Sequence, residues 1–118
     1  MGNRVIYVFG SNAQGIHGAG QALEAKQKWG AVQGIGRGLQ GNSYAVPTKH
    51  TPYKRMKLFE IANEVQLFLI FARKHPELTF KVNRLGCGRA GYTDKDIAPL
   101  FVDAPPNCIL PQEWQEYL

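Results

Sequence analysis

The sequence predicts an α/β fold with a mainly parallel sheet and helices on both of its faces. Segments with the composition of strands alternate with segments of helical periodicity along the chain, and this alternation is typical of parallel sheets. Residues 5–9 form a continuous β-branched and aromatic run, as expected for a central strand that is buried on both faces. With 118 residues, 44% hydrophobic and 19% charged, the chain fits a single domain over residues 1–118.

The elements of the first half follow from local composition. The strand at residues 5–9 is broken by Gly10-Ser11-Asn12, and residues 43–47 form a short strand that ends at Pro47. Residues 31–42 are rich in glycine and are expected to form a loop or an irregular strand. A helix is predicted over residues 19–29, with one apolar side and a glycine stop, at Ala22, Ala25, Trp29 and Gly30.

The second half holds the clearest helix, residues 57–74, where apolar residues recur at helical spacing. Three of its apolar side chains, Leu67, Ile70 and Phe71, extend beyond one core stripe, which favours either a fully buried helix or a homo-oligomer contact. The remaining predictions are a strand, a helix, a strand and a closing helical turn, at residues 78–85, 94–101, 107–110 and 111–118.

Composition limits the classes of function. The formal charge of +5 suits either general solubility or attraction of an anionic ligand. The positive charges are spread along the chain, without the basic block of a nucleic-acid arm. The longest apolar run, residues 67–72, is too short to span a membrane, and no signal-peptide h-region follows Met1. Cys87 and Cys108 fit neither a C-x-x-C pair nor a zinc pattern, so we expect two buried thiols in a reducing compartment such as the cytoplasm, with no metal or cofactor.

Two glycine-rich loops follow strands. The first, residues 10–20, carries Gly15, Gly18 and Gly20 between a strand and the start of a helix, where free N–H groups and the helix dipole favour an anion. The alternative is a tight turn packed on the sheet. The spelling G-x-G-x-x-G at residues 36–41 follows no good strand, so it is not a dinucleotide-binding fingerprint, and no Walker sequence is present.

The second loop, residues 86–92, repeats this arrangement before the next helix. Its glycines are expected to wrap a diphosphate, and Tyr92 either stacks on a sugar or base or caps the sheet edge. Cys87 is either a nucleophile or a small buried residue. Ligands of parallel sheets lie beyond the carboxyl ends of the strands, so we expect both loops, and Lys49 after the strand at residues 43–47, to open on one crevice.

These motifs resemble macrodomains, in the branch that contains the terminal ADP-ribose glycohydrolases and the antitoxins that remove ADP-ribose from DNA, and also small phage and bacterial proteins of this type. The resemblance rests on four segments. The first two are the strand and turn at residues 8–12 and the Gly-rich segment that leads into a helix ending in Lys-Gln-Lys-Trp29-Gly30. The other two are Thr48-Lys49 and Arg84-Leu-Gly-Cys-Gly88. It implies a three-layer α/β/α sandwich with a mixed, mostly parallel sheet, trimmed at the N-terminus.

The resemblance also implies an ADP-ribose site. Lys49 would act on the anomeric carbon of the distal ribose, with Asn12 beside that ribose. Gly18, Gly20, Gly86, Gly88 and Gly91 would face the diphosphate. The other expected ligand-binding residues are Gly10, Ser11, Gly15, Ala19, Thr48, Cys87, Arg89, Ala90 and Tyr92.

This chain departs from the family pattern in three ways. Some enzymes of the branch carry an aspartate where Ala90 stands; Asp94 or Asp96 would have to replace it, although both fit the start of a helix. The Gly-Asp-Ile-like strand whose aspartate holds adenine is missing, and the chain is short. The sequence therefore leaves three functions open: removal of ADP-ribose from modified DNA or protein, binding of an ADP-ribose derivative without turnover, or a structural oligomer with a vestigial pocket.

Overall fold

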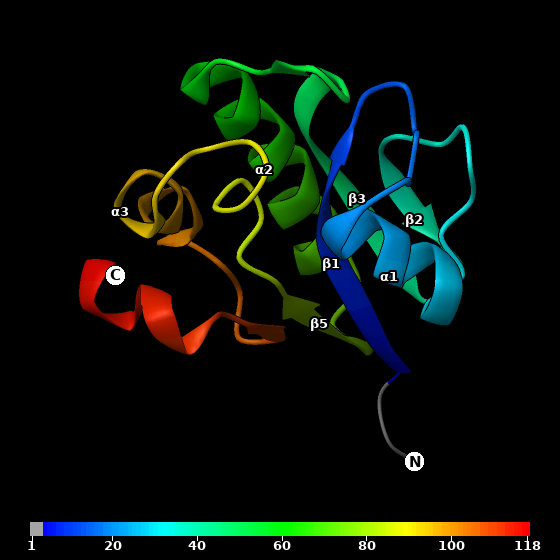
Figure 1. Cartoon of the computed structure of the whole chain (residues 1–118). Helices are drawn as coiled ribbons and strands as arrows, with labels where there is room; N and C mark the ends of the chain where they lie inside the picture. The colour runs from blue at the N-terminus through cyan, green and yellow to red at the C-terminus, as the bar shows by residue number, and fades with distance from the viewer. Residues whose placement is uncertain (1–3) are drawn as a thin grey trace.

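A mixed β-sheet lies between two layers of helices in the computed structural model, which describes residues 4–118 (Figure 1). Residues 1–3, which belong to the N-terminal segment considered above for a signal peptide, lie outside the described residues. The strands are β1 (Arg4–Asn12), β2 (Gly38–Gln40), β3 (Ser43–Thr51), β4 (Lys54–Arg55), β5 (Leu78–Val82) and β6 (Cys108–Ile109). The α-helices are α1 (Gly20–Lys28), α2 (Leu58–Lys74) and α3 (Asp94–Ile97), and 3₁₀ helices span Ala98–Phe101 and Gln112–Tyr117.

The sheet has the strand order β2-β3-β1-β5-β6, with β4 paired to β3. The pairs β1–β3, β1–β5 and β5–β6 are parallel, whereas β2 and β4 run antiparallel to β3. The predicted mixed, mostly parallel sheet is therefore confirmed. The burial of β1 on both faces is as expected over residues 6–9. The predicted break at Gly10-Ser11-Asn12 is wrong, because these residues continue β1 and pair with β3.

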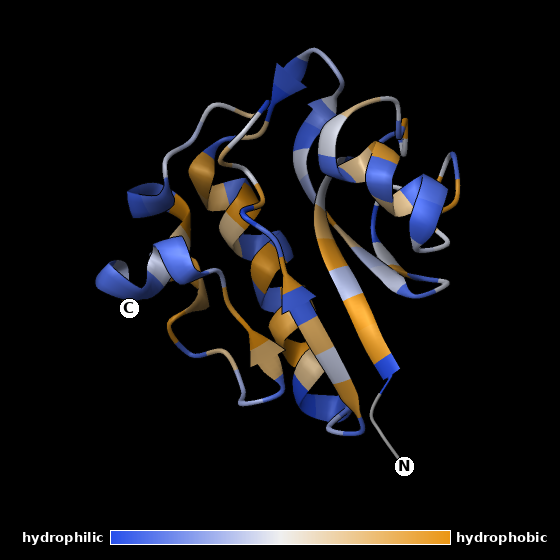
Figure 2. Ribbon diagram, turned by 60° about the horizontal axis from the view of Figure 1, so that its bottom comes forward, coloured by the Kyte–Doolittle hydropathy of each residue, from blue (hydrophilic) through white to orange (hydrophobic). Residues whose placement is uncertain are grey.

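Two hydrophobic cores hold the layers together. On one face, α2 buries its predicted stripe against the sheet, through Ile61, Val65, Phe68, Leu69 and Ala72. On the other face, α1 packs through Ala22 and Ala25, and Trp29 stacks on Tyr7 with ring centroids 5.2 Å apart. Figure 2 shows hydrophobic residues along the central strands and along the helix behind them.

The strand β3 is longer than predicted. It continues through Pro47 to Thr51, although proline lacks a backbone N–H for the sheet. The continuation is stabilised from two sides, because Ala13 N–H donates to Lys49 O at 2.8 Å and β4, which the sequence did not predict, pairs with residues 49–51. Thr48 and Lys49 therefore lie within the strand instead of following it.

β5 and β6 are shorter than predicted, and β6 spans Cys108–Ile109 instead of residues 107–110. β5 ends at Val82 rather than at residue 85, because the side chain of Asn83 donates to Val8 O at 2.8 Å and Leu85 N–H folds back onto Asn83 O. The predicted helix at residues 94–101 is one α-helical turn followed by a 3₁₀ helix that contains Pro99. A proline cannot donate the hydrogen bond that would continue the α-helix.

One interpretation of the sequence was that α2 is buried on all sides. The structure shows that it is not. Leu67 is 54% exposed and Ile70 is 45% exposed, whereas Phe71 packs partly against the core. Self-association through this surface stays a prediction. Among the described helices, none combines the length and the apolar character of a membrane span.

Candidate functional site

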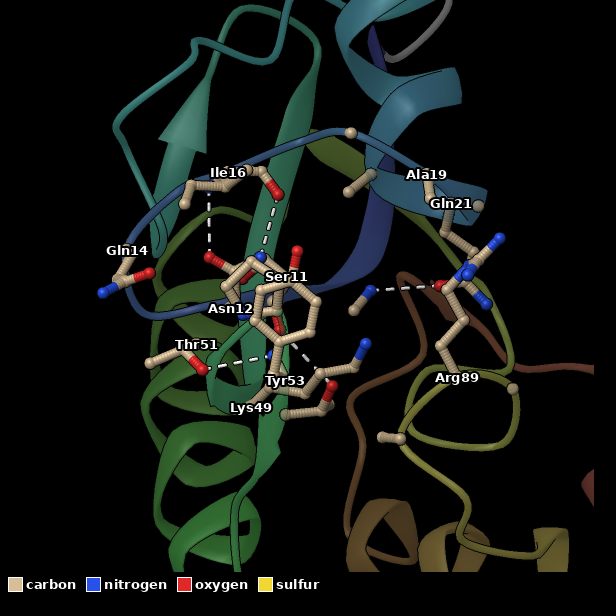
Figure 3. A pocket seen from close by; sticks show the side chains of 18 of the residues that line it. Ser11, Asn12, Gln14, Ile16, Ala19, Gln21, Lys49, Thr51, Tyr53 and Arg89 are labelled. Atoms are coloured by element: carbon tan, nitrogen blue, oxygen red, sulfur yellow. Dashed lines mark hydrogen bonds between the residues drawn. The ribbon is translucent and has the colours of Figure 1, made fainter.

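A cavity of about 770 Å³ opens at the carboxyl ends of β1, β3 and β5. The first loop forms one wall, the end of β3 and the turn after it form the second, and the second loop forms the third. Figure 3 shows the arrangement: Gln14 and Thr51 lie at one end, Lys49, Ser11 and Asn12 in the middle, and Gln21 and Arg89 at the other end. The three segments that the sequence placed on one crevice are brought together here.

Most of the predicted site residues line this cavity, and four do not. Those on its walls are Gly10, Ser11, Asn12, Gly18, Ala19, Gly20, Thr48, Lys49, Gly86, Gly88, Arg89 and Ala90. The four that lie off its walls are Gly15, Cys87, Gly91 and Tyr92. Ala90 presents a buried methyl group at the cavity wall.

Gly15 serves loop packing. A Cβ at Gly15 would stand 2.4 Å from the backbone of Gly34 and Ile35, and a Cβ at Gly36 would stand 2.4 Å from Asn12 O. The first loop and residues 34–36 therefore touch backbone to backbone. Gly36 is part of the G-x-G-x-x-G sequence at residues 36–41, and this close backbone contact explains why glycine is required at that position.

Gly18 and Gly88 are different from the other glycines of residues 4–118. At the others, either a positive φ or a close neighbour explains the absence of a side chain. At Gly18 and Gly88 neither does: no positive φ occurs and no atom lies within 4 Å of the position that a Cβ would take. Both line the cavity, one from each glycine-rich loop, and Gly88 also borders a second hollow, beside Cys87.

Backbone N–H groups are available on two walls. The first helical hydrogen bond of α1 is donated by Leu23 N–H to Ala19 O, so the N–H groups of residues 20–22 precede the helix's own bonds. Ala19 at the N-cap gives no side-chain bond, and the first turn carries no acidic residue. In the second loop, within the described residues, the N–H groups of Gly88, Arg89 and Ala90 donate to no protein acceptor. Such groups bind anions readily.

The cavity is electropositive. Lys49 and Arg89 line it, and none of its wall residues within 4–118 is Asp or Glu. Burial and then the charge of Arg89 hold the pKa of the Lys49 amine below its usual range. Two cations that repel one another in a cavity without a carboxylate favour an anionic occupant.

Asn12 fixes the first loop. Its side-chain Nδ2 donates to Ile16 O at 2.8 Å, and its Oδ1 accepts from Ile16 N–H at 3.0 Å. Asn12 is also the register partner of Lys49, at a β-bulge in the β1–β3 pair. Beside it, Ser11 Oγ donates to Gly36 O, and Thr48 Oγ1 donates to Ser11 O at 3.4 Å. These bonds give Asn12, Ser11 and Thr48 a framework role at the cavity floor.

Tyr92 and Cys87 belong to the second loop but do not line the cavity. Tyr92 OH donates to Met56 O at 2.6 Å, and the guanidinium of Arg55 lies 4.5 Å from the centre of its ring. The contacts of Tyr92 are thus with the protein, which agrees with the alternative that it caps the sheet edge and not with stacking on a ligand. Burial raises the pKa of the Cys87 thiol to about 12, which disfavours the thiolate that a nucleophile requires.

Neither candidate for the missing acid reaches the cavity. Asp94 accepts two hydrogen bonds from Arg84, at 3.0 and 2.7 Å, and one from Trp114 Nε1 at 2.8 Å. Asp96 forms a capping box with Thr93 at the start of α3. Both carboxylates lie in the first turn of α3 and are held there by hydrogen bonds, as the sequence analysis expected for residues at a helix start.

Sequence reasoning missed seven wall residues. They are Gln14, Ile16, Gln21, Ala22, Thr51, Pro52 and Tyr53. Gln21 accepts a hydrogen bond from Gly10 N–H at 3.0 Å and could have been suspected from its place in the first turn of a helix. Tyr53 stands at a hairpin that strand composition did not reveal, since β4 has two residues.

No model of a known protein family matches this sequence, and no curated protein matches it. Among solved structures, Thermosipho africanus DarTG in complex with ADP-ribose superposes with a TM-score of 0.65 over 94% of this chain, at 16% sequence identity. The chain has a macrodomain-like fold. It covers 39% of the DarTG chain, so the likeness concerns one part of that protein. Groups of His, Cys, Asp or Glu that could hold a metal do not occur among residues 4–118.

Proposed function

We propose that this chain binds ADP-ribose or a related nucleotide diphosphate in the cavity between its two glycine-rich loops. The observation that carries the proposal is the pair Gly18 and Gly88, which line the cavity from two loops and at which a Cβ would meet no atom within 4 Å. A ligand that lies against both backbones accounts for glycine at two positions where the fold does not need it.

The cavity suits the chemistry of a diphosphate. The start of α1 and the second loop offer N–H groups without protein acceptors, and Lys49 and Arg89 supply positive charge. The volume of about 770 Å³ falls within the range of roughly 300–1,000 Å³ that is usual for small-molecule sites. The structural neighbour with this fold was solved in complex with ADP-ribose, which supports the choice of ligand.

Isothermal titration calorimetry tests the proposal. The protein is titrated with ADP-ribose, AMP, NAD and cyclic ADP-ribose derivatives. We expect binding of a diphosphate-containing ligand, weaker binding of AMP, and loss of binding in Gly18→Val and Gly88→Val variants that still fold. Absence of heat with every ligand would contradict the proposal, and so would unchanged affinity in both glycine variants.

A second function, removal of ADP-ribose from a modified macromolecule, is favoured by one observation. Lys49 lies in the cavity with its pKa lowered by burial and by the charge of Arg89, and a lowered pKa makes the nucleophilic neutral amine more available. The amine would attack the anomeric carbon, so that an N–C bond forms while the glycosidic bond breaks and the carrier takes the proton. Water would then cleave the N–C bond and release ADP-ribose.

The two functions are separated by incubation with ADP-ribosylated DNA and ADP-ribosylated protein. Turnover that is lost in both Lys49→Ala and Lys49→Arg supports the hydrolase, because arginine keeps the charge without the nucleophile. Turnover that persists in Lys49→Arg contradicts the covalent route. If the unmodified chain binds ADP-ribose but shows no turnover, it is a binding module without catalysis. If it shows neither binding nor turnover, the structural role is the one that remains.

A further inference from the structure

The second glycine-rich loop, residues 86–92, has open space on two sides. Gly88 lines both the cavity and the second hollow, which the loop shares with the end of β5 and the segment after β6. Inside the loop, Gly91 N–H donates to Gly88 O at 3.0 Å and Tyr92 N–H donates to Gly86 O at 2.9 Å. Both bonds join the loop to itself, so its position over the cavity depends on what holds its two ends.

An ion pair bridges the ends of this loop. Arg84 precedes the loop and Asp94 follows it. The guanidinium of Arg84 donates through Nε to Asp94 Oδ1 at 3.0 Å and through Nη2 to Oδ2 at 2.7 Å. Two parallel bonds between an arginine and a carboxylate fix their mutual orientation as well as their distance. The pair therefore ties together the two points where the loop leaves and rejoins the folded core.

A buried tryptophan fixes the carboxylate of this pair. Trp114 is fully buried in the C-terminal 3₁₀ helix, which lies beside α3 (Figure 1). Its Nε1–H donates to Asp94 Oδ1 at 2.8 Å, and its ring packs on Phe101 with centroids 5.0 Å apart. An exposed ion pair alone adds little order, because both side chains must first be immobilised. Here Arg84 meets a carboxylate that the core already holds in place.

The loop itself lies against this cluster. Burial, and after it the carboxylate of Asp94, raises the pKa of the Cys87 thiol to about 12, which is consistent with a thiol beside that carboxylate. Cys87 directly precedes Gly88 in the chain. Within the described residues, the N–H groups of residues 88–90 donate to no protein acceptor. The position of Asp94 therefore influences the part of the loop that carries free donors.

We propose that Arg84, Asp94 and Trp114 form a clasp that positions the second loop for its ligand. None of the three lines the cavity, so they are positioning residues. A loop that is already ordered meets a diphosphate without the entropic cost of being ordered by it. The C-terminal segment thereby controls binding without touching the ligand. The inference rests on the proposed function, because it takes the ligand to be a nucleotide diphosphate in that cavity.

The clasp is tested first without ligand, by NMR hydrogen exchange of the Gly91 and Tyr92 amides in the full chain. Arg84→Lys keeps the charge but not the paired bonds, and Trp114→Phe keeps a buried ring without its donor. Both should speed exchange at these two amides by at least about tenfold through local opening, with exchange in β1 unchanged. Equal acceleration in β1 and in the loop would overturn the proposal, because the cluster would then only stabilise the whole fold.

The second test is calorimetry with ADP-ribose. Asp94→Asn and Trp114→Phe should each weaken binding by at least about fivefold, the cost of ordering a loosened loop. The double variant should be no weaker than Asp94→Asn alone, because residues of one network are not additive. The matched control is Asp96→Asn, which makes the same charge change in the same turn of α3 and should leave affinity within about twofold, since Asp96 bonds only to its neighbour Thr93.

Unchanged affinity in both Asp94→Asn and Trp114→Phe would overturn the clasp as a positioning device, even if those variants unfold at a lower temperature. A purely structural role would lower the unfolding temperature and leave the affinity of the folded molecules as it was. The two proposals fail separately. Absence of ADP-ribose binding in the unmodified chain contradicts the proposed function, whereas the exchange of the loop amides decides on the clasp in the ligand-free protein.

Discussion

Lys49 and Arg89 enter one cavity from different walls, and burial together with the charge of Arg89 lowers the pKa of the Lys49 amine. Relative to an unfolded chain with the ordinary value of 10.5, the folded protein therefore holds its Lys49 proton less tightly. The charged form of Lys49 opposes folding at neutral pH, and this penalty is relieved as pH rises from the folded-state pKa towards 10.5.

The first prediction concerns proton uptake on binding. A bound anion offsets the repulsion from Arg89 and raises the pKa of Lys49, so binding takes up protons at alkaline pH and weakens as pH increases through the pKa of the free protein. Calorimetry in two buffers of different ionisation enthalpy measures this uptake. Lys49→Met should remove it, and an unchanged uptake in that variant would show that another group titrates.

The second prediction concerns glycines. Gly18→Ala and Gly88→Ala should change the free energy of unfolding by less than about 1 kcal/mol, because their Cβ atoms meet open space. Both should weaken ligand binding by about 1–3 kcal/mol, the usual cost of an extra methyl group in a packed contact. Gly36→Ala is the control: its Cβ would stand 2.4 Å from Asn12 O, so thermal unfolding should shift strongly downward. Full affinity in both cavity variants would argue against a ligand between the loops.

The third prediction concerns Asn12. Asn12→Ala removes both hydrogen bonds to Ile16 and should destabilise the protein by about 1–3 kcal/mol. If the role of Asn12 is to hold the loop, the loss of ligand affinity should be accompanied by faster hydrogen exchange in residues 12–17. Lost affinity with unchanged exchange would indicate instead a direct contact between the amide and the ligand.

The fourth prediction concerns the thiols. Burial raises the pKa of Cys87 to about 12 and that of Cys108 to about 11, so at pH 8 the thiolate fraction of Cys87 is on the order of 10⁻⁴. Iodoacetamide should modify both cysteines slowly in the folded protein and rapidly in denaturant, as followed by mass spectrometry. Rapid modification of Cys87 in the native state would reopen a nucleophilic role for it. Activity should persist in Cys87→Ser if Lys49 carries the chemistry.

The sequence predicted the layers of the fold well because burial in strands and helices leaves a periodic pattern. Residues 5–9 and the stripe along α2 are examples. It predicted the cavity walls in the two loops because glycines mark close approaches of the backbone. It could not separate Gly15, which packs against Gly34, from Gly18, which faces the cavity, since that distinction depends on a contact between segments about twenty residues apart.

The hairpin was missed for a different physical reason. β4 has two residues, too few for any alternation of polar and apolar side chains, and Pro47 is a usual mark of a strand end. Its pairing with β3 is fixed by tertiary contacts, among them the bond from Tyr92 to Met56. Tyr53 and the neighbouring cations therefore gained their place beside the cavity only in three dimensions.

The strand order has a consequence for how copies of this chain can meet. The sheet is bounded in the described residues by β2 and β6, with three and two residues. Such short borders give little template for backbone pairing between molecules. Side-chain contacts, for example over the exposed Leu67 and Ile70, are therefore favoured over strand pairing as the basis of any assembly, and their substitution would test this without disturbing the sheet.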